Sequence, residues 1–76
     1  IMITVNIMLN SINDVKDFVG TVLMYDFEID LTSGRYIVDA KSIMGIFSLD
    51  LSKPIKLDAH CDNCDDFVEK IKPYIV

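Results

Sequence analysis

Apolar and polar side chains alternate in several short stretches of this chain, which is the pattern of a β-strand that buries one face. Alternation of this kind occupies residues 3–9, 27–31 and 55–60, and residues 36–40 are rich in strand-forming types. Ser33 and Gly34 separate the two middle stretches, and such a pair favours a turn. The sequence therefore predicts four strands, of which the middle two form a hairpin.

Helical spacing of apolar residues replaces alternation after the first predicted strand. The apolar positions are Val15, Phe18, Val19, Val22 and Leu23. Just before them, Ser11 and Asp14 have the spacing of a capping box, with Asp in place of the usual Glu or Gln. We therefore expect a helix over residues 12–23 that lays one apolar stripe on the sheet.

Two shorter helices are expected further along the chain. Ser42 can cap the apolar segment that follows it, which predicts a helix over residues 42–49. Asn63 is expected to cap a last helix over residues 63–72, whose first turn carries acidic residues that suit the helix dipole. Pro73 marks the end of that helix, because proline cannot continue it.

These elements follow one another in the order βαββαβα, within a single domain spanning residues 1–76. Each strand has one apolar face and each helix one apolar stripe, so the helices are expected to cover one side of the sheet. The predicted fold class is α+β, an open-faced two-layer sandwich of a four-stranded antiparallel sheet with three helices on one face.

The balance of charge excludes some classes of ligand. Twelve acidic residues against seven basic ones give a net charge of −5. This charge repels a phosphate backbone, so nucleic acid is not an expected partner. The apolar stretches near the N-terminus fall short of the roughly 20 residues that a membrane span needs. No basic region of a signal peptide precedes them, so we expect a cytoplasmic location without membrane contact.

One segment of the sequence resembles a known family. Lys41-Ser42-Ile43-Met44-Gly45, followed by Ser48-Leu49, is similar to the regulatory-serine segment of HPr, the histidine-containing phosphocarrier protein of the bacterial phosphotransferase system. The predicted order of elements is also similar to that of HPr over the whole chain. The resemblance implies a protein related to the phosphotransferase system that is not an enzyme and uses no cofactor.

A second segment departs from the HPr pattern. HPr carries phosphate on a histidine in a His-x-Arg-Pro motif before its first helix, whereas the matching residues here are Ser11-Ile12-Asn13-Asp14. A phosphate relay needs an imidazole, because a serine ester is too stable to pass the phosphate on. The single histidine, His60, ends the last predicted strand, which is the wrong place in the element order. The chain therefore resembles the histidine-less catabolite-repression homologue (Crh), a regulator rather than a carrier.

The resemblance implies a regulatory role for Ser42. HPr kinase/phosphorylase would phosphorylate it, helix amides and the Lys41 side chain would receive the phosphate, and the modified protein would bind a transcriptional regulator or a phosphotransferase-system protein. The implied partner-binding residues are Ser11, Asn13, Lys41, Ile43, Met44, Ile46 and Phe47. Four large apolar side chains in one short helix cannot all point inward, so some are expected to be exposed. From its position alone Ser42 is a helix cap, and the two roles are compatible.

His60, Cys61 and Cys64 form a second cluster of reactive side chains. Their spacing could hold zinc, and a Cys-x-x-Cys pair at a helix start could be redox-active. An alternative function is therefore a small metal-binding or thiol redox protein. Because a strong zinc pattern needs a second ligand pair, and only Asp62 or Asp65 could supply a fourth ligand, we expect structural or incidental thiols without stoichiometric zinc.

Overall fold

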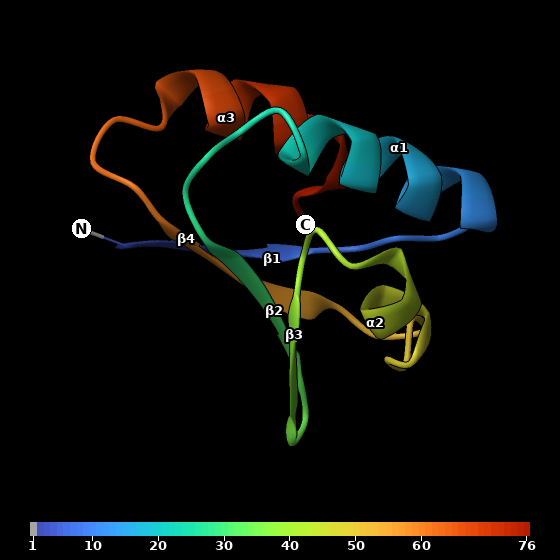
Figure 1. Cartoon of the computed structure of the whole chain (residues 1–76). Helices are drawn as coiled ribbons and strands as arrows, with labels where there is room; N and C mark the ends of the chain where they lie inside the picture. Colours follow the sequence, from blue (N-terminus) through green and yellow to red (C-terminus); the bar gives the residue numbers. More distant parts are fainter. Residues whose placement is uncertain (1) are drawn as a thin grey trace.

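The computed structural model describes residues 2–76. Its elements are β1 (Met2–Ile7), α1 (Ile12–Val22), β2 (Ile29–Ser33), β3 (Tyr36–Asp39), α2 (Ile43–Phe47), β4 (Ile55–His60), α3 (Asp65–Ile71) and a closing 3₁₀ helix, η1 (Lys72–Tyr74). The predicted order βαββαβα and the predicted sandwich of a four-stranded antiparallel sheet with three helices are confirmed (Figure 1). Within the described range, no helix has the length and apolar character needed to cross a membrane.

The strands lie in the order β1-β4-β2-β3, and all neighbours are antiparallel. Leu57 on β4 faces Val5 on β1 and Leu31 on β2, and Leu31 in turn faces Val38 on β3. This apolar row crosses the whole sheet on its covered side. Successive side chains of a strand point to opposite faces, so the next row lies on the uncovered side. That row consists of Thr4, Asp58, Asp30 and Asp39.

The helices and the sheet share one hydrophobic core. In Figure 1, α1 and α3 lie together over one side of the sheet, and α2 packs against α1 and β3. The buried helical side chains are Val15, Phe18, Val19, Val22, Ile46, Phe67 and Ile71. The first four have the spacing that the sequence predicted for the stripe of the first helix.

The start of α1 is capped as the sequence predicted, with one difference. Ser11 is the N-cap residue, and its Oγ accepts a hydrogen bond from the backbone N–H of Asp14 at 3.1 Å. The Asp14 carboxylate accepts from the backbone N–H of Asn10 at 3.0 Å, one residue before the usual capping-box donor. Both bonds satisfy backbone donors that the helix itself leaves unpaired.

The predicted cap of the last helix is wrong. Cys64 is the N-cap residue of α3, no side chain makes a capping hydrogen bond, and the helix begins at Asp65. Asn63 lies inside the four-residue loop closed by a disulfide between Cys61 and Cys64, so the chain enters the helix only after that loop. The helix ends before Pro73, as predicted, and continues into η1.

The predicted second strand lies two residues later than expected, at Ile29–Ser33 instead of residues 27–31. Phe27 was expected in the strand but lies before it, and β2 begins at Ile29. The Phe27 ring packs against Tyr25 and Phe67, with centroids 5.4 Å and 5.3 Å away. Packing against these rings, rather than strand pairing, fixes the position of Phe27.

The free edge of β1 is partly closed by the C-terminal residues. Met8 donates its backbone N–H to the Tyr74 carbonyl at 2.8 Å, and Val76 donates to the Asn6 carbonyl at 3.0 Å. The strand itself ends at Ile7 instead of Leu9, although Leu9 remains buried. Pairing with the chain end therefore replaces the last part of the predicted strand and leaves β3 as the open edge of the sheet.

Candidate functional site

Ser42 begins α2 with its hydroxyl at the surface. Its backbone is extended, with φ −101° and ψ 103°, and its Oγ accepts a hydrogen bond from the Gly45 N–H at 3.2 Å. Its carbonyl accepts the N–H of Ile46 at 3.0 Å, which is the first hydrogen bond of the helix. The predicted cap is confirmed, and the exposed hydroxyl is open to chemistry from solvent.

Gly45 allows this turn to approach the edge strand. A Cβ atom at position 45 would lie 3.2 Å from Ser42 Oγ and 3.2 Å from Val38 Cβ. Both contacts are tighter than most Cβ contacts in proteins, so a larger residue would require Ser42 Oγ and Val38 Cβ to shift by a few tenths of an ångström. The short helix therefore depends on both Ser42 and the glycine three positions later.

Lys41 does not extend toward its neighbouring serine. Its ammonium group donates to the Tyr25 carbonyl at 2.6 Å, in a partly buried position, and its backbone N–H donates to the Asp39 carboxylate at 2.8 Å. The side chain that was expected to receive a phosphate on Ser42 is thus already engaged with the loop after α1. It holds that loop against the segment that leads into α2.

The apolar residues of α2 separate into buried and exposed groups. Ile46 is fully buried, and Ile43 is partly buried against the core, so Ile46 is not part of the surface on which the sequence placed it. Met44 is 77% exposed and Phe47 is 41% exposed. The expectation that the four apolar side chains cannot all point inward is confirmed, since a five-residue helix has only one side facing the core.

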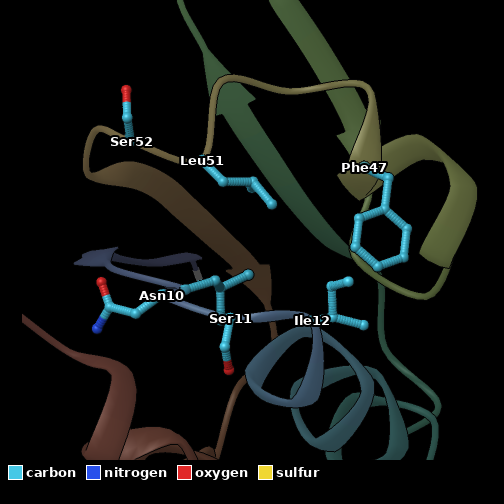
Figure 2. A pocket seen from close by; sticks show the side chains of 7 residues that line it. Asn10, Ser11, Ile12, Phe47, Leu51 and Ser52 are labelled. Atoms are coloured by element: carbon cyan, nitrogen blue, oxygen red, sulfur yellow. The ribbon is translucent and has the colours of Figure 1, made fainter.

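A shallow cavity of about 400 Å³ lies where the start of α1 meets the end of α2. Its lining residues are Leu9, Asn10, Ser11, Ile12, Phe47, Leu51 and Ser52. In Figure 2, Ile12, Phe47 and Leu51 extend into the same space from three separate segments. Ile12 is 63% exposed although it is large and apolar. We call Ile12, Met44 and Phe47 the apolar patch.

Ile12 and Leu51 were not among the site residues predicted from the sequence. Ile12 could have been found, because it falls outside the core stripe of α1 and is therefore an apolar residue with no core position to fill. Leu51 lies in an irregular loop, where no periodicity indicates which way a side chain faces.

Ser11 and Asn13 differ in their relation to the cavity. Ser11 lines it, but its hydroxyl is already bonded to the Asp14 N–H. Asn13 is exposed on the first turn of α1 and is not among the lining residues. Of the two, only Ser11 shares a surface with Phe47.

The second predicted cluster does not form a metal site. The sulfur atoms of Cys61 and Cys64 are bonded to each other, and His60 Nε2 lies 3.4 Å from the Asp30 carboxylate. Over residues 2–76, no three His, Cys, Asp or Glu side chains gather in a way that could hold a metal ion. The three residues are adjacent in sequence, but the disulfide and the Asp30 contact occupy them separately.

No protein-family profile and no curated protein matches this sequence. Among solved structures, HPr-C-His from Thermoanaerobacter tengcongensis matches with a TM-score of 0.74 and 28% identity, over 96% of this chain and 88% of that chain. The phosphocarrier protein HPr from Bacillus anthracis str. Ames matches with a TM-score of 0.73 and 22% identity, over 100% of this chain and 96% of that chain.

These matches confirm the HPr-like fold that the sequence resemblance implied.

Proposed function

We propose that this chain is an HPr-like regulatory binding module, related to the phosphoenolpyruvate-dependent sugar phosphotransferase system but without a phosphoryl-carrying histidine. Phosphorylation of Ser42 by HPr kinase/phosphorylase switches its affinity for a partner. The observation that carries the proposal is the exposed hydroxyl of Ser42 at the start of α2, a short helix that also carries the exposed Met44 and Phe47, in an HPr-like fold.

The absence of a histidine relay has support at both relevant positions. Where the HPr pattern has its histidine motif, this chain has Ser11, whose hydroxyl is bonded to the Asp14 N–H. The single histidine, His60, ends β4 beside Asp30 and belongs to the uncovered side of the sheet. A serine at position 11 cannot form the reactive phosphoramidate that a relay transfers.

The switch combines charge with apolar area. A phosphate on Ser42 adds about −1.5 to −2 charge units and three strong acceptor oxygens. A partner that presents Arg or Lys beside an apolar groove gains charge-assisted hydrogen bonds that the plain hydroxyl does not offer. The apolar patch supplies contact area in both states, so the phosphate decides the selectivity. A transcriptional regulator or a phosphotransferase-system protein is the class of partner that this scheme suits.

A mass measurement tests the proposal. The wild type, Ser42→Ala and Ser48→Ala are incubated with HPr kinase/phosphorylase and ATP, and the intact masses are recorded. Ser48 is a matched control because it is exposed at the other end of the same helix, as its C-cap residue. We expect the wild type and Ser48→Ala to gain one phosphate and Ser42→Ala to gain none. An unmodified wild type, or equal labelling of all three proteins, would contradict the proposal.

A further inference from the structure

Cys61 and Cys64 form a disulfide in the loop between β4 and α3, and no free cysteine remains in the described chain. Their Cα atoms are 6.1 Å apart. Cys61 directly follows the last residue of β4, and Cys64 is the N-cap residue of α3. The bond therefore ties the end of a central strand to the start of a helix.

The fold has other attachments at this place. Cross-linking so short a loop removes less chain entropy from the unfolded state than cross-linking a long one, so the bond adds less to folding than most disulfides do. Phe67, one turn into α3, is fully buried, and its ring centroid lies 5.1 Å from that of Tyr25 and 5.3 Å from that of Phe27. Because this packing holds α3 on the core, the disulfide can open without unfolding the domain.

We propose that Cys61–Cys64 is a reversible redox site that exchanges with low-molecular-weight thiols of the glutathione class. Both cysteines are largely buried, and Cys61, at 9% exposed against 4% for Cys64, is the one whose sulfur the incoming thiolate attacks. The protein S–S bond breaks, a mixed disulfide forms on Cys61, and Cys64 leaves as a thiolate that takes up a proton. A second thiolate attacks the glutathione sulfur of the mixed disulfide and releases Cys61, which is protonated in turn. Two glutathione thiols are thereby oxidised to one disulfide while the protein disulfide is reduced to two thiols.

The surroundings of the pair limit it to slow exchange. Asp62 lies between the two cysteines in sequence, and Asp65 and Asp66 form the first turn of α3. These carboxylates repel an anionic thiolate such as that of glutathione. A thiol reagent that carries no other charged group should therefore react faster than glutathione. Added salt should reduce the difference between the two exchange rates. Fast thiol oxidoreductases have electropositive surroundings instead.

Opening the bond releases one of the restraints on the first turn of α3. No side chain caps this helix. After reduction two hydrogen bonds still hold the turn. The Val68 N–H donates to the Cys64 carbonyl at 2.8 Å, and the Tyr25 hydroxyl donates to the Asp66 carboxylate at 2.6 Å. We expect the Val68 amide to exchange hydrogen faster in the reduced protein, while the amides of the central strands keep their protection.

The test equilibrates the full chain with glutathione buffers of varied reduced-to-oxidised ratio, starting from fully oxidised and from fully reduced protein. Free thiols are trapped with an alkylating agent and counted by intact mass. We expect both starting forms to converge on one transition in which two thiols appear together, with the circular dichroism of the fold retained. Cys61→Ser, the control, should show no such two-thiol transition.

Three results would overturn the proposal: an oxidised protein that keeps its bond at every ratio, a reduced protein that never forms it, or loss of the fold on reduction. The test contains no kinase, so its outcome is independent of the role proposed for Ser42.

Discussion

At the scale of single residues, the start of α2 depends on a hydroxyl that is both a cap and the proposed site of modification. Ser42 Oγ satisfies the Gly45 N–H, and the glycine leaves room for that contact beside Val38. Since a cap is a local interaction between residues three positions apart, the sequence could predict it. The engagement of Lys41 with the Tyr25 carbonyl joins residues 16 positions apart and has no local signal.

The capping role of Ser42 predicts a graded loss of stability. Ser42→Ala should lower the free energy of unfolding by about 1 kcal/mol, and Ser42→Gly should lower it by only a few tenths. The order of the two effects separates loss of a cap from loss of contact area, since glycine removes more atoms than alanine does. Urea unfolding of the three proteins gives the measurement, and an equal or reversed order would contradict the cap.

The contact between Tyr25 and Asp66 predicts a difference at alkaline pH. The hydrogen bond to the Asp66 carboxylate raises the pKa of Tyr25 above its ordinary value of 10.0. The phenol of the unfolded chain therefore ionises first, so the stabilisation is complete below about pH 10 and is lost as the pH rises through the folded-state pKa. Tyr25→Phe should therefore have a lower urea midpoint than the wild type at about pH 8. Between about pH 8 and about pH 11, the midpoint of the variant should fall less than that of the wild type.

Tyr36→Phe is the matched control for this effect, because Tyr36 is 68% exposed on β3 and its removal leaves the Asp66 contact intact. It should leave both midpoints close to those of the wild type. Burial also raises the pKa of Tyr74, so the Tyr25 variant keeps part of the alkaline sensitivity. Identical alkaline behaviour of the Tyr25 variant and the wild type would contradict the contact.

At the scale of elements, the uncovered face of the sheet brings three carboxylates into one row. Asp30 on β2 faces Asp58 on β4 on one side and Asp39 on β3 on the other. Like charges directly opposite each other across strands are destabilising. Alternation in the sequence predicted that Asp30 and Asp58 face away from the core, but only the register between strands shows that they share a row with Asp39.

This row predicts that removal of its central charge stabilises the domain. Asp30→Asn should raise the free energy of unfolding by about 0.5 kcal/mol at low salt, because the amide relieves repulsion from both neighbours. The gain should shrink as salt is added, since exposed charges are screened. Asp26→Asn changes the same charge at an exposed loop position and should give no comparable gain. A destabilised Asp30→Asn protein would show that the contact with His60 outweighs the repulsion.

Element boundaries were less predictable than element types. The periodicity of α1 and the alternation of β4 are properties of the local sequence, and both elements lie where predicted. The start of α3 depends on the disulfide before it, and the start of β2 depends on the packing of Phe27 against Phe67. Contacts between residues distant in sequence decide such boundaries. A prediction from residue type alone therefore put the cap at Asn63 instead of Cys64.

At the scale of the whole molecule, the residues of the apolar patch come from different parts of the chain. Ile12 starts α1, whereas Met44 and Phe47 lie on α2, and the cavity between the helices exists only after folding. The sequence predicted exposed apolar residues on α2, but it could not show that Ile12 and Leu51 face the same space.

The apolar patch predicts a directional effect on the kinase reaction. Met44→Asp should raise the KM of HPr kinase/phosphorylase for this protein by roughly tenfold, because loss of an apolar contact at a docking surface costs on the order of 1 kcal/mol or more. Ile37→Asp is the matched control, since Ile37 is 69% exposed on β3 and belongs to the uncovered face. Urea unfolding checks that both variants remain as stable as the wild type. Equal KM values for the two variants would remove the patch from the docking surface.

The chemical nature of the bound phosphate tests the central claim most directly. The protein is offered phosphate in two separate reactions, from ATP through HPr kinase/phosphorylase and from phosphoenolpyruvate through the relay enzymes, and each product is then exposed to acid. We predict an acid-stable serine ester in the first reaction, located on Ser42 by fragmentation of the intact protein, and no label in the second. An acid-labile phosphate on His60, transfer from phosphoenolpyruvate to Ser11, or a first reaction that leaves Ser42 unmodified would contradict this account.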